Sequence, residues 1–523
     1  MMKISFISLD PILGGFGLRS ISSCLKQRGH TTEIFFMESD VEHEHVLIKH
    51  DSFYSDKILQ AVSDAVCGAD LIGLSCMAVE APKALQIVKH LGTLNIPVIW
   101  GGIHATSHPD ECIQYADYVC IGEGENAVCD LAEAMDSGRD TSKIPNLWFR
   151  QNGEVIKNPV RPLIQDLDAL PFPDYSFDSH YLLEEEGFVG AEEYYRNVTW
   201  FMVHTTRGCP LSCSYCCNSV LQKIYDNKNR KVRRTSVETV LRQLEKYKEM
   251  FPRIGKIWFT DDTFFIRPTN ELREFAAGYK ERVAIPFKCF TTPGTLNVEK
   301  LESLLEAGMI SLDMGIQSGS DNINKNVYKR NVANATVVKA AELLYRYKNR
   351  MYPPAYQIII QNPYEIESDL METIHLLHSL PPYYQLEVFH LTLFPGSELA
   401  NRAKADGMLK GDSLISFYNF QKSFELSENE KYLNFLIFLM SGNVNTDRIG
   451  HIRRSLIPLL TSKGLRNFFS RNPRLLDYLI ESYFQRSPLP QNRLKRYATF
   501  GTIALGCIFR SFGKKTNKTE RTH

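Results

Sequence analysis

The sequence predicts an α/β protein with two sheet-forming parts, a doubly wound (Rossmann-like) N-terminal domain and a partial (β/α)6 barrel of the TIM type, followed by a helical C-terminal region. Residues 3–140 alternate short apolar strands with amphipathic helices, a pattern typical of a parallel sheet covered by helices on both faces. The alternation stops in a proline-rich stretch and resumes near residue 198. Beyond about residue 410 the apolar positions recur with a helical period.

Composition describes an ordinary globular chain of 523 residues, with 44% hydrophobic residues, 23% charged residues and a formal net charge of zero. At ~150 residues per domain, this length allows three or four domains. We expect them at 1–143, 144–197 (a linker), 198–409 and 410–523. The balanced charge gives no case for nucleic acid as a partner. The twelve cysteines, with no apolar leader before the first strand, favour a reducing cytoplasm.

The N-terminal alternation defines a five-stranded parallel sheet. The expected strands are Lys3–Leu9, Glu33–Met37, Leu71–Cys76, Pro97–Trp100 and Tyr118–Ile121, and the helices include Gly17–Arg28 and Ala81–Leu91. In such sheets ligands bind beyond the carboxyl ends of the strands. Those ends are small and flexible here, and they contain Ser75, Gly101, Gly102, Gly122 and Glu123. Glycine permits close backbone approach to a ligand, so these ends could serve a nucleotide, a flavin or nothing.

The expected linker is rich in proline and carries one hairpin signal. Residues 146–150 and 154–158 are predicted to pair through a turn at Asn152-Gly153. The acidic and aromatic stretch Phe177–Tyr195 is interpreted as a solvated connection in preference to a lid over a substrate.

The second alternation predicts six barrel strands. They are Val198–Thr206, Lys256–Thr260, Pro286–Phe290, Ile310–Ile316, Tyr356–Gln361 and Leu386–Leu393, with helices Val237–Met250, Asn270–Arg282, Val298–Ala307, Ala333–Lys348 and Ser368–Leu380 between them. Barrel enzymes carry their chemistry at the carboxyl ends of the strands. Polar residues gather at those ends, as in Asp261-Asp262 and Gln317-Ser318.

Three cysteines follow the first barrel strand, where Cys209, Cys213 and Cys216 form a C-x3-C-x2-C motif. A cubane iron-sulfur cluster offers four irons to thiolates, so three ligands would leave one iron open to a substrate. A zinc site would need a fourth ligand, and only Cys217 is adjacent. A redox C-x2-C pair lacks its usual short βαβ context, and a disulfide framework belongs to small secreted domains.

This strand and its cysteine loop, with Tyr215 before the last cysteine, resemble the radical S-adenosylmethionine (SAM) enzymes. The Pro-Val-Ile-Trp-Gly-Gly-Ile-His and Gly-Glu-Gly-Glu signatures before it resemble the cobalamin-binding subfamily, over residues 1 to about 410. The resemblance implies a 4Fe-4S cluster on the three cysteines, S-adenosylmethionine chelated at the open iron, and base-off cobalamin beside the first sheet. It also implies an electron donor such as flavodoxin or ferredoxin.

The resemblance assigns further residues. Tyr215, Asp261, Gln317 and Ser318 are expected at S-adenosylmethionine, although Asp261 could equally cap a helix. The five strand-end residues of the first sheet, Ser75, Gly101, Gly102, Gly122 and Glu123, are expected at cobalamin. No catalytic residue is assigned. Arg330 could pair with a carboxylate or lie on the surface.

The loop after the first strand departs from the D-x-H-x-x-G pattern of cobalamin mutases, because Ile12 stands where the axial histidine would be. The subfamily generally omits this ligand, so we expect cobalt without a histidine from this loop. His104 and His108 are placed near the corrin edge at most.

The reaction that the resemblance favours is methylation of an unactivated carbon or phosphorus of a small molecule or lipid. In that mechanism one S-adenosylmethionine methylates cobalamin and a second gives the deoxyadenosyl radical. A non-methylating cyclase and a non-catalytic binding protein are the alternatives.

The C-terminal tail, Arg486–His523, is strongly basic around the apolar run Ala498–Phe509. That run is too short to span a bilayer. Such a segment can lie on an anionic membrane, so peripheral membrane contact is one expectation and a disordered tail is the other.

Overall fold

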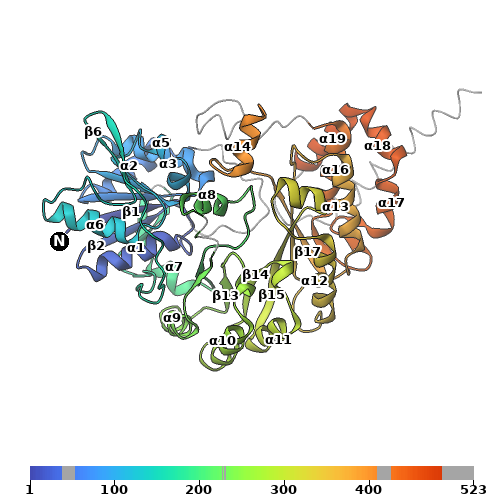
Figure 1. The fold of residues 1–523 in the computed structure, drawn as a ribbon, viewed down its shortest axis with the longest axis horizontal. Helices are drawn as coiled ribbons and strands as arrows, with labels where there is room; N and C mark the ends of the chain where they lie inside the picture. The colour runs from blue at the N-terminus through green and yellow to red at the C-terminus, as the bar shows by residue number, and fades with distance from the viewer. Residues whose placement is uncertain (38–52, 186, 227, 229–230, 409–425, 486–523) are drawn as a thin grey trace, which may run out of the picture.

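The computed structural model describes residues 1–37, 53–185, 187–226, 228, 231–408 and 426–485, and these residues build two nine-stranded sheets. Figure 1 shows the first sheet, in blue, at one side of the molecule and the barrel, in green and yellow, beside it. The C-terminal helices, in orange, pack at the far end of the barrel. The predicted fold class is confirmed.

The first sheet has the order β7-β6-β5-β4-β3-β1-β2-β8-β9. Its strands are β1 (Lys3–Ser8), β2 (Thr31–Phe36), β3 (Leu71–Ser75), β4 (Val98–Gly101), β5 (Tyr118–Cys120), β6 (Leu147–Gln151), β7 (Glu154–Lys157), β8 (His180–Glu184) and β9 (Gly187–Gly190). The helices are α1 (Phe16–Gln27), α2 (Asp56–Val66), α3 (Ala81–Leu91), α4 (Gly102–Ser107), α5 (Pro109–Cys112) and α6 (Glu125–Asp136). β1 to β5 pair in parallel, so their carboxyl ends share one edge.

The residues expected to form a linker add strands to both ends of this sheet. The predicted hairpin is present as β6 and β7, and it pairs with β5. The interpretation of 177–195 as a solvated connection is wrong, because β8 pairs with β2 and Tyr195, in α7 (Glu192–Asn197), is fully buried. Arg19 explains this burial. Its guanidinium, also fully buried, donates to the Asp174 carbonyl at 2.7 Å and to the Tyr195 hydroxyl at 3.1 Å.

The second sheet begins with parallel strands in the order β10-β13-β14-β15-β16-β17. They are β10 (Trp200–Val203), β13 (Lys256–Phe259), β14 (Phe287–Thr291), β15 (Met309–Gln317), β16 (Ala355–Ile360) and β17 (Tyr384–His390). The helices are α8 (Cys217–Ile224), α9 (Val237–Met250), α10 (Thr269–Arg282), α11 (Val298–Ala307), α12 (Asn334–Arg346), α13 (Glu367–Ser379) and α14 (Glu398–Ala405). A separate two-stranded sheet pairs β11 (Thr206–Arg207) with β12 (Arg233–Arg234).

Local signals explain where the barrel helices begin and end. The side chains of Ser236 and Asn297 accept backbone hydrogen bonds at the starts of α9 and α11, and such caps satisfy amide groups that the first turn leaves unpaired. Gly308 ends α11 in the left-handed conformation, which glycine adopts without steric cost.

The C-terminal region is helical with three short strands. β18 (Gly442–Val444) pairs antiparallel with β17, and β19 (Arg448–Ile449) and β20 (Ile452–Arg453) follow. The helices are α16 (Glu428–Leu439), α17 (Ile457–Leu460), α18 (Lys463–Ser470) and α19 (Pro473–Gln485). In the described ranges, no helix is long and apolar enough to cross a membrane. The basic tail 486–523 lies outside the described residues.

An aromatic cluster joins the first sheet to the barrel. Tyr175, from the stretch between the sheets, packs against Phe201 of β10 at 4.9 Å between ring centroids and against Tyr247 of α9 at 5.1 Å. Tyr175 also contacts α1, because the Arg19 guanidinium carbon lies 3.9 Å from the centroid of its ring. Buried aromatic contacts of this kind stabilise an interface well beyond their area alone, so this cluster fixes the position of α1 relative to the barrel.

Candidate active site

A cavity of about 510 Å³ lies between the carboxyl edge of the first sheet and the start of the barrel. All five strand-end residues predicted to bind cobalamin line it, namely Ser75, Gly101, Gly102, Gly122 and Glu123. Phe6, Gly73 and Ile99 also line it, so the cavity continues alongside β1, β3 and β4. The barrel contributes residues that include His204, Arg207, Cys217 and Asp262. A large ligand could therefore lie beside the sheet and face the cysteine loop.

The glycines of this wall are required by close packing. Gly102 has a φ of +85°, and a Cβ atom there would lie 2.6 Å from the Ser75 hydroxyl and 3.1 Å from the Cys76 carbonyl. Gly122 also has a positive φ, of +73°, and a Cβ atom there would overlap the Tyr225 hydroxyl. These glycines let the wall pack tightly and keep side chains off its backbone, which suits a broad ligand held against the backbone. The cavity therefore fits the cobalamin that the first sheet is expected to hold.

Replacing Gly102 with alanine should raise the dissociation constant for cobalamin at least about tenfold, because the new methyl group displaces Ser75 in the cavity wall. The matched control is Gly138→Ala, at a φ of +63° with no atom within 4 Å of the new methyl group. In both variants an alanine must adopt the left-handed backbone conformation, which lowers the folding stability by ~1–2 kcal/mol. Equilibrium dialysis should show weaker cobalamin binding in Gly102→Ala alone. Equal cobalamin affinities in the two variants would show that the glycine wall does not determine cobalamin binding.

The three cysteines of the motif sit on one short loop. Cys209 and Cys213 are buried, and Cys216 stands just before α8. Hydrogen bonds hold the middle of the loop, since the Ser214 amide donates to the Tyr328 carbonyl at 2.9 Å and the Ser214 hydroxyl to the Val327 carbonyl at 2.6 Å. These two bonds tie the middle of the cysteine loop to the segment that follows β15.

Hydrogen-bond donors reach two of these sulfurs. The Arg330 guanidinium lies 3.8 Å from Cys213 Sγ, and the Asn218 amide lies 3.8 Å from Cys216 Sγ. Burial raises the pKa of Cys209 to about 12, because a buried thiolate loses its hydration. Donors directed at sulfur are the groups that stabilise thiolates on an iron-sulfur cluster, so the donor set fits the cluster.

The interpretation of Arg330 as a surface residue is wrong, because only 5% of this residue is exposed to solvent. A second hydrogen bond, 2.8 Å to the Gly315 carbonyl, ties it to the carboxyl end of β15. Tyr215, predicted at S-adenosylmethionine, packs edge-on against Tyr328 at 5.0 Å. Arg330 thus links the cysteine loop to the end of β15. Gln317 and Ser318 at that end are predicted to contact S-adenosylmethionine, as Tyr215 is.

Gln317 and Ser318 end β15 in a tightly built turn. Gln317 has a φ of +73°, and the buried Ser318 hydroxyl donates to Glu365 at 3.0 Å. Burial raises the pKa of Glu365 to about 8. The roles of Gln317 and Ser318 stay predictions. Glu365, which follows β16, was missed, although its place after a strand end is the same signal that selected Asp261.

The two adjacent aspartates after β13 differ in direction. Both oxygens of Asp261 are occupied, by the Thr205 amide at 2.7 Å and the Thr205 hydroxyl at 2.9 Å. Asp262 instead faces the cavity, where Asn218 donates to it at 3.0 Å. Partial removal from water raises the pKa of Asp262. The role given to Asp261 stays a prediction, and the geometry makes Asp262 the better placed carboxylate.

His204 is a further cavity residue that the sequence did not reveal. It follows β10, stacks on Phe16 of α1 at 5.6 Å between centroids, and places Nδ1 3.1 Å from the Thr260 carbonyl. A ring nitrogen beside a carbonyl donates to it, so Nε2 is the nitrogen that remains for another partner. His104 and His108, by contrast, are not among the residues that line the cavity.

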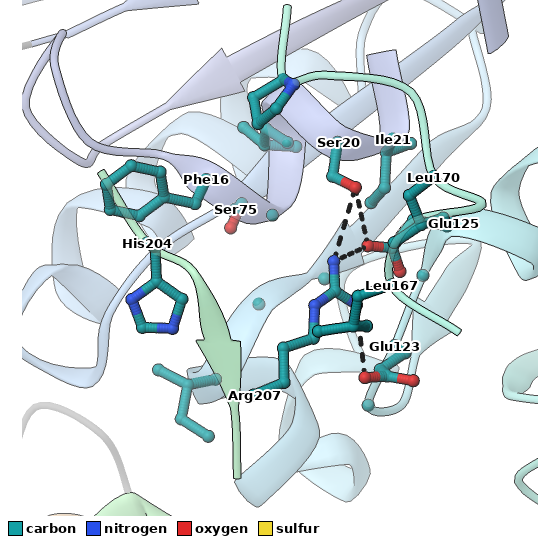
Figure 2. A pocket seen from close by; sticks show the side chains of 18 of the residues that line it. Phe16, Ser20, Ile21, Ser75, Glu123, Glu125, Leu167, Leu170, His204 and Arg207 are labelled. Carbon is teal, nitrogen blue, oxygen red and sulfur yellow. Dashed lines mark hydrogen bonds and ion pairs between the residues drawn. The ribbon is translucent and has the colours of Figure 1, made fainter. Parts of the chain in front are cut away.

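Two arginines and two glutamates join the cavity wall to the cysteine loop, and Figure 2 shows three of them, Arg207, Glu123 and Glu125. Arg207 pairs with Glu123 at 3.2 Å and with Glu125, and Arg233 pairs with Glu123 at 2.7 Å. Burial by itself would raise the pKa of Glu125, but the Arg207 guanidinium outweighs it and the pKa is lowered. Glu123, predicted to bind cobalamin, is thus also an ion-pair partner of the loop.

Comparisons with known proteins agree with this geometry. Residues 2–132 match the B12 binding domain and residues 203–377 match the radical SAM superfamily. The chain is 26% identical to an uncharacterized methyltransferase of Pyrococcus horikoshii, over 72% of this chain and 78% of that protein. It is 26% identical to the anaerobic magnesium-protoporphyrin IX monomethyl ester cyclase of Rubrivivax gelatinosus, over 58% of this chain and 52% of the cyclase.

A solved structure shares the fold. The radical SAM methyltransferase TsrM from Kitasatospora setae, with cobalamin and a [4Fe-4S] cluster bound, superposes with a TM-score of 0.60 at 16% identity. The match covers 79% of this chain and 76% of TsrM. With both family models matched in the order cobalamin domain then radical domain, the chain belongs to the cobalamin-dependent radical SAM enzymes, and its cofactors are a 4Fe-4S cluster, S-adenosylmethionine and cobalamin.

Proposed function

We propose that this enzyme methylates an unactivated carbon, or a phosphorus centre, of a small molecule or lipid. The observation that carries the proposal is the single cavity lined both by the strand ends of the first sheet and by residues around the cysteine loop. The similarity to a protein named as a methyltransferase, over most of both chains, supports it. We also propose a cytoplasmic location with a flavodoxin or ferredoxin as electron donor.

The chain's own residues would position and shield the reacting groups. Cys209, Cys213 and Cys216 would hold the cluster, and the glycine wall would hold cobalamin. When bound, these cofactors supply radical formation and methyl carriage, which are the cofactors' own chemistry. Arg330 and Asn218 would fix the thiolates by their hydrogen bonds. Asp262 presents a carboxylate to the cavity, where it could bind an amino group.

Product analysis tests the proposal. Reduced protein with S-adenosylmethionine, cobalamin and candidate substrates should form both 5'-deoxyadenosine and S-adenosylhomocysteine, together with a methylated product. Deoxyadenosine alone would favour a non-methylating cyclisation, for which the similarity to the Rubrivivax gelatinosus cyclase is the specific observation. Formation of neither product by protein with a full cluster would favour a binding role.

Cobalt in this enzyme should carry no protein histidine, and cobalamin should be bound base-off. Ile12 is fully buried in the loop after β1, in the position that the axial histidine would occupy. Electron paramagnetic resonance of the cob(II)alamin form should therefore show no nitrogen splitting. A clear nitrogen triplet would contradict this expectation, and its loss in a His204→Ala variant would then identify the only cavity-lining histidine among the described residues as the ligand.

A further inference from the structure

The two-stranded sheet that leads into the cysteine loop is weak by itself. β11 and β12 contain two residues each, and their register places Arg207 directly opposite Arg233. An isolated two-stranded ribbon is marginally stable, and like charges directly opposite each other destabilise a strand pair. Cys209 follows Arg207 by two residues. The position of the first cluster ligand therefore depends on whatever holds these two arginines together.

The carboxylates of the Gly122-Glu123-Gly124-Glu125 loop hold them. Glu123 Oε1 lies 3.2 Å from Arg207 Nη1 and 2.7 Å from Arg233 Nη1, and so bridges the two like charges. Glu123 Oε2 accepts the Ile164 amide at 2.8 Å, which fixes the carboxylate from behind. Glu125 accepts from Arg207 and from Ser20 of α1, the latter at 2.9 Å. Two carboxylates and two guanidinium groups balance, so this half-buried ion-pair network carries no net charge.

The same loop is a wall of the cobalamin cavity. Its four residues line the cavity, as do Arg207 and Gly208, and Figure 2 shows Arg207 bonded to Ser20 and Glu125 on one side and to Glu123 on the other. A ligand that contacts the backbone of residues 122–125 therefore affects the positions of the Glu123 and Glu125 carboxylates. These carboxylates hold Arg207 of β11, the strand before Cys209. The reverse also holds, because a cluster that orders the cysteine loop orders Arg207.

We propose that Arg207, Glu123 and Glu125 are positioning residues that couple the occupancy of the cobalamin cavity to the geometry of the cluster loop. This role goes beyond methyl transfer, because it concerns the two cofactor sites and needs neither substrate nor turnover. Coupling between two sites is reciprocal. A loop already ordered by the cluster costs less to order again on cobalamin binding, so cobalamin binds more tightly to the cluster-loaded protein.

The test compares cobalamin affinity with and without the cluster. Hydroxocobalamin is titrated anaerobically into full-length protein in both forms, for wild type and for the double variant Arg207→Met/Glu125→Leu. Both partners are replaced together because removing one would leave an uncompensated buried charge, and Glu123 and Arg233 still balance. The control is Arg282→Met, which removes an arginine bound by Glu238 at 2.6 Å and Glu245 at 2.7 Å on the outside of the barrel.

We expect wild type and the Arg282 control to bind cobalamin at least about fivefold more tightly with the cluster present, and the double variant to show no difference. The electron paramagnetic resonance spectrum of the reduced cluster should respond to cobalamin in wild type and not in the double variant. Equal affinities of the two wild-type forms would overturn the proposal, as would an unchanged ratio in the double variant. If the double variant does not fold, Glu125→Gln, which keeps the shape and loses the charge, should reduce the ratio, and an unchanged ratio would count against the coupling. None of these outcomes depends on methyl transfer.

Discussion

Alanine at Cys213 should remove the cluster and all deoxyadenosine formation. Cys213 is buried, the Arg330 guanidinium is directed at its sulfur, and Ser214 beside it is held by two hydrogen bonds. No neighbouring sulfur can replace it without breaking that loop geometry. Anaerobic reconstitution should give full cluster absorption in wild type and almost none in Cys213→Ala, with the same result for Cys209→Ala and Cys216→Ala.

The matched control for this experiment is Cys217→Ala. Cys217 is the first residue of α8 and lines the cavity, and although its thiol contacts that of Cys216, it stands outside the C-x3-C-x2-C spacing. It should be dispensable for the cluster. A full cluster in Cys213→Ala, or a complete loss in Cys217→Ala, would mean that the ligand set is wrong.

Removing His104 should make the protein markedly more resistant to acid. His104 of α4 is fully buried, and neither ring nitrogen has a hydrogen-bond partner among the described residues. Burial lowers its pKa to about 3, while an unfolded histidine has a pKa of about 6.5. The unfolded chain therefore takes up a proton first, and stability that is complete above pH 6.5 is lost as the pH falls toward 3.

Each pH unit across this window costs about 1.4 kcal/mol for one such group. His104→Leu should thus flatten the decline of the unfolding midpoint between pH 6.5 and 4 in cluster-free protein, while changing the midpoint at pH 7.5 little. The control is His375→Leu on α13, where the imidazole is exposed. An unaltered pH dependence in His104→Leu would show that other groups, such as the buried His180, govern acid unfolding.

Features with a local signal could be predicted from the sequence. The helix Ala81–Leu91 is observed with the predicted bounds, and β3 ends within one residue of its predicted end, because apolar periodicity and flanking glycines are encoded within the segment itself. The cysteine loop follows the same logic. Its spacing and the apolar strand before it lie within twenty residues of chain.

Features that depend on distant partners were missed. β11 and β12 have two residues each and contain arginines, so they have no apolar period to detect. Arg330 is a core residue because its guanidinium bonds the Gly315 carbonyl of β15 and the Cys213 sulfur, and both partners are distant in the sequence. The choice between Asp261 and Asp262 turns on which of two successive side chains faces the cavity, and a strand end is uncertain by one or two residues in any sequence-based assignment. The buried charges at Glu123 and Glu125 likewise required the second domain in place.

The antiparallel strand β18 decides what kind of barrel this can be. β17 pairs with β16 on one edge and with β18 on the other, so the half of β17 that β18 covers has no free edge to offer β10. A closed barrel has a radius fixed by its strand number and stagger, and this sheet is released from that relation. Its curvature can widen or narrow without any strand being added or lost. In such a protein the size of substrate that fits would be adjusted by the helices that brace the last parallel strands, such as α16 beside β16. The other parallel strands and the cofactor-binding edges could then stay constant while the substrate changes.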